Sequence, residues 1–261
     1  MEIALYQIDA FASEVFQGNP AAVCPLVSWL PDSVLQKIAE ENNLSETAFY
    51  VPAESGFYLR WFTPASEVDL CGHATLAAAF VIFRIIGYEF PVIRFRTRSG
   101  DLIVGRDKES CIMDLTTLAK KICRPPADLI AGLKREPVEV LFSEDYIAVF
   151  DNEDDIISLD PDYETLRKLD RRGVLVTSRG KNVDFVSRFF APKMGISEDP
   201  VTGSSHCELM PYWAEKLKKT KLKARQLSRR GGELGCELRG NRVLISGRAV
   251  KYMEGRIFID V

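Results

Sequence analysis

The segment RWFTPASEVDLCGHATL, residues 60–76, organises the rest of this 261-residue chain. It passes from a β-forming run through a polar loop and a Gly-His pair to the start of an apolar stretch. A second copy follows roughly half a chain later, as RFFAP at residues 188–192 and SEDPVTGSSH at residues 197–206. A repeat of this length predicts two similar domains, because the repeats of solenoid proteins recur about every 20 to 50 residues.

The repeat continues beyond these motifs. The segment RSGDL at residues 98–102 is matched by RGGEL at residues 230–234, again about half a chain apart. Two matches in the same order at a near-constant offset are not expected by chance. We therefore predict an internally duplicated protein whose domains are residues 1–118 and 119–261, and whose terminal strand can return to the first domain.

An apolar helix is predicted at residues 74–86. Its residues are hydrophobic on almost every side, and a helix without a polar face has to be surrounded by protein. We expect a curled sheet to enclose it. In the second half a helix is predicted at residues 204–218, where Pro211 should bend the helix or displace its start, because proline lacks the N–H of the helical ladder.

Three further expectations concern the second half of the chain. Residues 116–128 contain two lysines and a proline pair, and they form the predicted linker. The acidic stretch at residues 151–155 is predicted to be a solvated loop. Residues 242–246 and 257–261 are predicted to form two separate strands near the end of the chain.

The composition excludes several classes of function. A formal net charge of −3 gives no support for nucleic-acid binding, which normally needs a basic face. The longest uncharged apolar run, residues 74–83, is far shorter than the roughly 20 residues of a membrane span. The six cysteines lack CxxC spacing, and the first residues lack a leader pattern. A cytoplasmic protein with free thiols is therefore expected.

The two motif copies place a glycine at each of two predicted helix starts, Gly72 and Gly203. A helix N-terminus has unpaired N–H groups and a partial positive charge, so it attracts anions. Glycine also lets a ligand approach the backbone closely. If the two halves face each other, the ligand that suits the site best is a small carboxylic acid.

Glu46 and His73 are the acid–base candidates of the first half. Glu46 opens a segment rich in β-formers, so its carboxylate faces either solvent or the interior. In the interior, a raised pKa would let it move protons near neutral pH. His73 follows Gly72 at the start of the apolar helix, a position that suits a catalytic imidazole or a buried, hydrogen-bonded one equally well.

The second half offers Asp199 together with the hydroxyls of Thr202, Ser204 and Ser205. Asp199 is either a capping or turn residue or a member of the catalytic set. His206 is the only other histidine of the chain, and both a structural and a functional role stay open for it.

Other chemistries find less support. A metal site could draw on the Cys–His pair of each motif, but neither pair has the spacing of a structural zinc motif, and no metal is predicted. These pairs are Cys71 with His73, and His206 with Cys207. Cys71 could be a nucleophile, since a helix start lowers a thiol pKa, but no Cys-His signature accompanies it. Neither GxGxxG nor GxxxxGK[ST] occurs, so no dinucleotide or P-loop fold is predicted.

Several short motifs, taken together and in order, resemble the PhzF-like (phenazine-biosynthesis-like) family from about residue 5 to residue 250. Each motif is weak alone, but the ordered set is specific. The motifs are DAF at residues 9–11, GNPAAV at 18–23, SETAF at 45–49, FTP at 62–64 with GH at 72–73, and EDPVTGS at 198–204.

The resemblance implies a diaminopimelate-epimerase-like α+β fold. Each of its two similar domains is then a curled, mostly antiparallel, barrel-like sheet around a central helix, with the site in the cleft between them. The implied activity is that of a cofactor-free isomerase, which moves a proton between carbons of a small carboxylate-bearing substrate. The characterised member acts on a dihydro-hydroxyanthranilate. A homodimer is also implied.

Site residues follow from the resemblance motif by motif. The implied catalytic residues, with Glu46 as the acid/base, are Glu46, His73 and Asp199. The implied substrate-binding residues, two of which would offer backbone N–H groups to a carboxylate, are Asn19, Gly72, Thr202, Gly203 and Ser204.

The chain also departs from the family and its neighbours. Cys71 is similar to one cysteine of the two-thiol epimerases, but residues 199–205 contain no second cysteine to act on the other face of a substrate carbon. The segment GCEL at residues 235–238 replaces a Gly-Arg-Pro stretch of many relatives, so the resemblance does not name the substrate. Two alternatives stay open: a non-catalytic carboxylate-binding or interaction protein of the same fold, and a Cys71-dependent racemase or epimerase.

Overall fold

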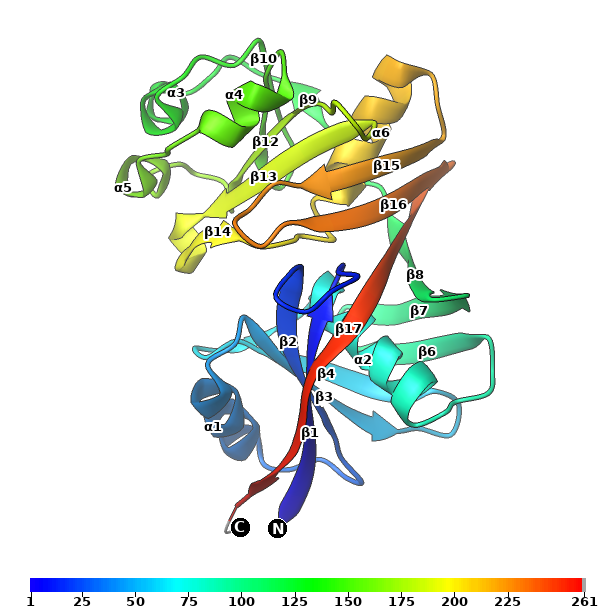
Figure 1. The fold of residues 1–261 in the computed structure, drawn as a ribbon. Coiled ribbons are helices and arrows are strands. Elements are labelled where there is room, and N and C mark those ends of the chain that lie inside the picture. The colour runs from blue at the N-terminus through cyan, green and yellow to red at the C-terminus, as the bar shows by residue number, and fades with distance from the viewer. Residues whose placement is uncertain (260–261) are drawn as a thin grey trace. The chain divides into compact units, whose positions relative to one another are not determined.

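The structure, a computed structural model, describes residues 1–259 and divides into two compact units. The first unit contains Met1–Asp114 together with the chain from Ile245 onward, and the second contains Leu115–Leu244. Helices and strands are mixed in both units, as expected for an α+β protein (Figure 1). Within the described residues, no helix has the length and apolar character needed to cross a membrane.

The first unit is a mixed sheet with two helices. Its elements are β1 (Glu2–Ala10), β2 (Asn19–Pro25), α1 (Asp32–Asn42), β3 (Glu46–Pro52), β4 (Phe57–Phe62), β5 (Glu67–Val68), α2 (Gly72–Phe80), a π-helical turn (Val81–Ile85), β6 (Val92–Thr97), β7 (Gly100–Asp107) and β8 (Ser110–Thr116). The last strand of the chain, β17 (Arg242–Phe258), begins in the second unit and ends in the first.

Antiparallel and parallel pairs alternate in this sheet. β1 pairs antiparallel with β2, β2 parallel with β3, β3 antiparallel with β4, and β4 parallel with β6. β6, β7 and β8 then form an antiparallel meander. The parallel register of β2 and β3 sets Glu46 beside Ala21, at the end of β3 where the site is built.

α2 is the central helix of the first unit. Every residue from His73 to Ala79 is buried, and the helix packs against β1, β2 and β3 (Figure 1). The prediction of an enclosed apolar helix is therefore confirmed, although the helix starts at Gly72 and its last turn is π-helical. The large buried side chains are Leu76 in the helix and Val81, Ile82 and Phe83 in the π-helical turn, and burial of each contributes about 1.5–3 kcal/mol.

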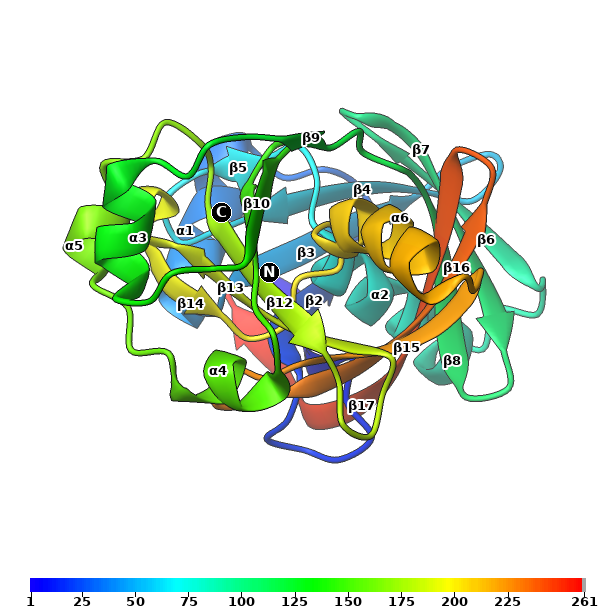
Figure 2. The same cartoon turned by 90° about the horizontal axis from the view of Figure 1, so that it is seen from above.

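The second unit contains more helices. Its elements are β9 (Lys121–Ile122), α3 (Ala127–Leu133), β10 (Glu139–Phe142), β11 (Tyr146–Val149), α4 (Glu153–Ser158), α5 (Tyr163–Leu166), β12 (Val174–Arg179), β13 (Phe185–Ala191), a 3₁₀ turn (Pro192–Met194), β14 (Ile196–Asp199), α6 (His206–Leu217), β15 (Lys221–Gln226) and β16 (Gly232–Arg239). Figure 2 shows α3 beside α5, and α6 against β15 and β16.

The strands of the second unit repeat the pairing order of the first. β10 pairs antiparallel with β11, β11 parallel with β12, β12 antiparallel with β13, and β13 parallel with β15. β15 and β16 close the series as an antiparallel pair. A short strand also follows the fourth strand of each series, β5 beside β4 and β14 beside β13.

Two predictions about the second half are wrong. Residues 151–155 are not a loop throughout, because α4 begins at Glu153. The Asn152 side chain accepts a hydrogen bond from the Asp155 N–H, and three acidic residues occupy the first turn, where the helix dipole favours negative charge. The strands predicted at residues 242–246 and 257–261 are parts of one strand, β17, which continues through Gly247 and Gly255. Residues 260–261 lie outside the described residues.

Pro211 lies inside α6, and the helix continues on both sides of it. A proline at this position removes the N–H that would bond the Cys207 carbonyl one turn earlier. The Leu118 N–H from the segment before β9 donates to that carbonyl instead, at 3.1 Å. The connecting segment therefore satisfies the group that the proline leaves unbonded.

Candidate active site

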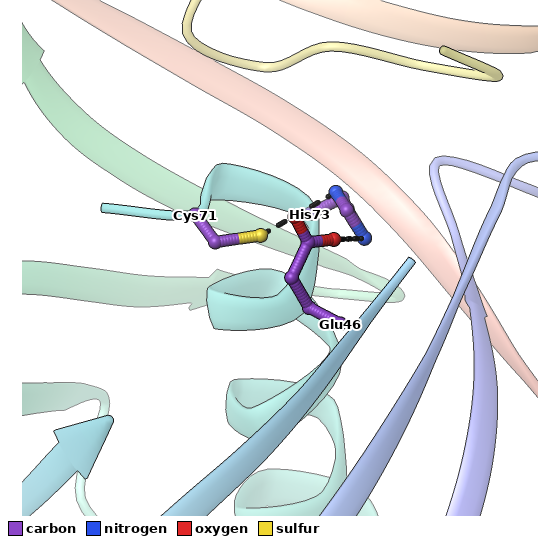
Figure 3. Close-up of side chains that lie close together, drawn as sticks. All are labelled: Glu46, Cys71 and His73. Atoms are coloured by element: carbon purple, nitrogen blue, oxygen red, sulfur yellow. Dashed lines mark hydrogen bonds and ion pairs between the residues drawn. The ribbon is translucent and has the colours of Figure 1, made fainter. Parts of the chain in front are cut away.

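A cluster of three side chains lies at the start of α2 (Figure 3). His73 Nε2 lies 3.0 Å from Glu46 Oε2, and His73 Nδ1 lies 3.5 Å from Cys71 Sγ. The Glu46 side chain is only 12% exposed, so its carboxylate faces the protein interior and not bulk water. The structure thus brings together the two acid–base candidates of the first half.

The backbone at the start of α2 explains this arrangement. Cys71 is the extended residue before the helix, and Gly72 is the first helical residue. The Thr75 hydroxyl donates to the Cys71 carbonyl at 2.6 Å and fixes the turn. His73 therefore projects from the first turn, while Glu46 reaches it from the first position of β3.

Asn19 is fully buried and contacts His73 Nδ1 through its amide Nδ2 at 3.2 Å. The glycine before it holds the turn, since Gly18 has φ +65 and a Cβ there would lie 2.1 Å from the Ala10 carbonyl oxygen. Asn19 Oδ1 also lies 3.4 Å from the Ser45 hydroxyl. An amide has a donor end and an acceptor end. Asn19 can therefore turn either end toward His73 and bond it with or without a proton on Nδ1.

The ionisation of the pair differs from the expectation for Glu46. Burial would raise the pKa of the Glu46 carboxyl, but the charge of His73 and the close polar contacts with His73 and Cys71 hold that pKa below its usual value. Burial disfavours the charged form of His73 as well, yet Cys71 and Glu46 raise the pKa of His73 well above 6.5. The expected raised pKa of Glu46 is therefore wrong, because a cationic partner outweighs desolvation.

Neither Glu46 Oε2 nor His73 Nε2 has an aligned hydrogen bond within the described residues, although both atoms are buried. Their 3.0 Å contact is thus an ion pair whose N–H does not point at the oxygen. Buried polar atoms are normally hydrogen-bonded, so two unpartnered atoms on adjacent titratable groups need an explanation, and a catalytic role is one. The arrangement is suited to a carboxylate base beside an imidazolium acid.

Cys71 is a weak nucleophile in this setting. Burial and the neighbouring Glu46 carboxylate raise the pKa of the Cys71 thiol to about 11, so at neutral pH it keeps its proton. A thiol in that state cannot act as the base of a racemase without a large cost. All six cysteines are free, as the sequence predicted.

Glu46, Cys71 and His73 also form the one group within residues 1–259 that could hold a metal ion, with ligand atoms within 4.8 Å of one another. This set differs from the Cys–His pairs considered from the sequence. His73 Nδ1 faces both the Asn19 amide and the Cys71 thiol, so Nε2 is the ring nitrogen of this set without a hydrogen-bond partner among the described residues.

The second motif copy builds another cluster, within the second unit. The Thr202 hydroxyl donates a short hydrogen bond to the Asp199 carboxylate at the end of β14. Gln226, the last residue of β15, accepts from the Thr202 N–H at 2.9 Å and donates to the Asp199 carbonyl at 2.8 Å. Asp199 and Thr202 are both buried.

Gly203 and Ser204 lie in a turn before α6, and the helix starts at His206. The N–H groups of His206 and Cys207 bond three residues back, to Gly203 and Ser204, so the chain enters the helix through tight turns. The predicted start at residue 204 is therefore two residues early. The roles of Gly203 and Ser204 toward a substrate stay predictions.

His206 is a structural histidine within its unit. Its Nδ1 lies 2.9 Å from the Thr202 carbonyl, and its ring lies beside that of Phe185. Complete burial lowers the pKa of His206 to about 4, so the ring is neutral at physiological pH and Nδ1 donates to the carbonyl. It thus holds the Thr202 backbone in place.

Gln226 was missed by the sequence analysis. In β15 the buried positions alternate, and Gln226 lies on the same face as Leu222 and Ala224. The sequence did contain a signal for Gln226, because a polar residue stands where the alternating strand pattern predicts an apolar one. A buried polar side chain normally requires hydrogen-bond partners, so this position indicates a buried polar contact.

Each motif also contains a partly buried arginine–glutamate pair. Arg60 contacts both carboxylate oxygens of Glu67 at 2.7 Å, and Arg188 contacts those of Glu198 at 2.7 and 3.0 Å. Bidentate pairs of this kind fix geometry as well as charge. In both units the pair links the fourth strand of the series to the short strand that follows it, β4 to β5 and β13 to β14.

The comparisons with known proteins agree with these features. The family described as "Phenazine biosynthesis-like protein" matches residues 8–255. This chain belongs to the PhzF-like family. An uncharacterized isomerase of Pseudomonas aeruginosa is 52% identical over 99% of this chain and 100% of its own length.

Solved structures extend the likeness to the fold. A PhzF family protein of Enterococcus faecalis has a TM-score of 0.97 and 45% identity, covering 99% of this chain and 100% of its own. A predicted epimerase of Pseudomonas aeruginosa has a TM-score of 0.76 at 20% identity, covering 99% of this chain and 100% of its own, and it shares the fold alone. The PhzF-like chain thus has the mixed, barrel-forming α+β sheet of this group.

Proposed function

We propose that this protein is a cofactor-free isomerase that moves a proton between two carbons of a small carboxylate-bearing molecule. The observation that carries the proposal is the buried pair of Glu46 and His73, 3.0 Å apart with no aligned hydrogen bond between them. The isomerase names of the relatives support the same class of reaction.

In the proposed mechanism Glu46 is the base. Its lowered pKa keeps it ionised at neutral pH, so it can accept a proton from a carbon next to an activating group. His73, with its raised pKa, carries a proton and stabilises the negative charge that develops on the substrate. The carboxylic acid formed on Glu46 then returns the proton to a second carbon of the same molecule.

The second unit supplies the remaining substrate contacts in this proposal. Asp199 orients the substrate, together with Thr202 and Ser204, and the Gly203 N–H binds its carboxylate, as Gly72 does in the first unit. The substrate lies in a cleft between two similar domains that arose by duplication. The repeated strand pairing and the repeated arginine–glutamate pairs support that origin. A homodimer in the cytoplasm remains part of the proposal.

A screen in deuterium oxide tests the activity. The protein is incubated with small carboxylic acids, among them anthranilate, dihydro-hydroxyanthranilate and proline, and the carbon-bound hydrogens are followed by NMR. Exchange or isomerisation by the wild type and its loss in Glu46→Gln would support the assignment. Equal activity of the two proteins would refute the role of Glu46.

The two alternatives make different predictions. A Cys71-dependent racemase requires a reactive thiolate, and the Cys71 pKa of about 11 argues against one. A non-catalytic carboxylate-binding protein would bind acids without exchanging their carbon-bound hydrogens. The buried ion pair favours catalysis over that alternative, because binding alone has no need for a base beside an imidazolium.

A further inference from the structure

The loop from Asp199 to Thr202 is held by side chains in place of a regular backbone ladder. The Asp199 carbonyl accepts from the Gln226 amide, and the Pro200 carbonyl accepts from the Ser228 hydroxyl at 2.7 Å. At Thr202 the N–H donates to Gln226 and the carbonyl accepts from His206. Among these hydrogen bonds of the described residues, those of Gln226 reach both ends of the loop.

The donors and acceptors at Gln226 have one consistent direction. Its Nε2 group donates to the Asp199 carbonyl at 2.8 Å and to the Thr202 hydroxyl oxygen at 3.2 Å. Its Oε1 accepts from the Thr202 N–H, which identifies the amide nitrogen and oxygen unambiguously. Since the Thr202 oxygen receives a hydrogen bond from Gln226, its own hydrogen is free to point at the Asp199 carboxylate.

We infer that Gln226 is a positioning residue of the substrate site. It directs the Thr202 hydroxyl toward the Asp199 carboxylate and holds the peptide that leads into Gly203. This inference rests on the proposed function, in which Asp199, Thr202 and Gly203 contact the substrate. Gln226 is fully buried and uses both ends of its amide on this loop, so an apolar side chain could fill the space but could not make the same hydrogen bonds.

Two substitutions distinguish the effect of Gln226 on the direction of the Thr202 hydroxyl from its effect on the packing of the loop. Gln226→Leu removes every hydrogen bond of the amide. Gln226→Glu keeps an acceptor for the Thr202 N–H but removes the donor, and the introduced carboxylate attracts the Thr202 hydroxyl away from Asp199. If direction matters, Gln226→Glu is as impaired as Gln226→Leu, although it retains one more hydrogen bond.

The measurement is the dissociation constant of a carboxylate probe, by calorimetry, with benzoate, anthranilate and proline tried on the wild type and the tightest of them used. We expect both Gln226 variants to bind the probe about 10- to 100-fold more weakly, which is the affinity lost when one or two hydrogen bonds to a charged ligand are misplaced. Circular dichroism must first show that each variant is fully folded at the assay temperature, because a reversibly unfolded fraction would by itself raise the apparent dissociation constant.

Gln36→Leu is the matched control. Gln36 donates its amide to the Thr63 carbonyl at 2.9 Å, so the same change removes a side-chain bond to a loop outside the proposed site. It should leave the dissociation constant unchanged. Wild-type affinity in both Gln226 variants would overturn the inference, and so would an unimpaired Gln226→Glu beside an impaired Gln226→Leu.

A failure of the proposed function gives results that differ from a failure of the inference about Gln226. If no probe binds the wild type, the carboxylate site and this inference fall together. If probes bind but Glu46→Gln does not change proton exchange, the catalytic role of Glu46 is refuted. The effect of Gln226 on binding is then still decided by the dissociation constants of the Gln226 variants.

Discussion

Replacement of Glu46 by glutamine removes one charge from the buried pair and leaves the shape of the side chain. At the observed 3.0 Å, two unit charges attract by about 5.5 kcal/mol at an effective dielectric constant of about 20. Burial opposes both charges, so the net stabilisation of the imidazolium is smaller than this figure. Without the carboxylate, desolvation should dominate and the pKa of His73 should fall.

The chain is well suited to measuring this change, because it contains only two histidines. In an NMR titration of the wild type, one imidazole should titrate near pH 4, as expected for His206, and the other well above 6.5, as expected for His73. In Glu46→Gln the upper titration should move down toward or below 6.5, and the His206 titration should not move. Turnover should fall by about 10²- to 10⁴-fold, the usual contribution of a general acid–base group.

Glu40→Gln provides the control, since it makes the same change at an exposed position of α1. An upper titration that stays in place in Glu46→Gln would refute the ion-pair reasoning. Full turnover in that variant would refute the catalytic role even if the titration moves.

Three other predictions follow from buried groups. Cys71→Ala should retain most of the activity and alkylating reagents should react slowly, because the thiol pKa is about 11; rapid inactivation by iodoacetamide would favour the thiol mechanism. His206, with its pKa lowered to about 4, makes the folded state lose stability as pH falls from 6.5 toward 4, by about 3 kcal/mol at most, and His206→Gln should flatten that acid limb in chemical denaturation. Burial, together with Asp145, raises the pKa of Glu208 to about 9, so the unfolded chain releases this proton more easily and stability is lost as pH rises from 4.5 toward 9. Glu208→Gln should therefore raise the melting temperature, with a gain that grows over this pH range. A melting temperature below that of the wild type at pH 8 would show instead that the carboxyl group stabilises the folded state.

The enclosed helix could be predicted because local sequence determines it. The run from Ala74 to Ile86 has no polar face, whatever surrounds it. Glu46 and His73 were identified by type and by motif, but the sequence could not decide whether Glu46 faces inward. That depends on the parallel register of β2 and β3, which no local pattern encodes.

Other features depend on tertiary contacts. The pKa of Glu46 is lowered because His73 is charged beside it, whereas the sequence suggested only burial. The role of Gln226 requires knowing that β15 ends beside the loop at Asp199. β17 was divided in two because charged residues and two glycines interrupt its apolar pattern, although pairing with β1 carries it through.

The central claim is that Glu46 carries a proton between carbons of one substrate. The most direct measurement is deuterium incorporation at a carbon of the product in deuterium oxide, compared between the wild type and Glu46→Gln. We predict carbon-bound deuterium or intramolecular proton transfer with the wild type and neither with the variant. A product that forms equally fast with both proteins would contradict the claim.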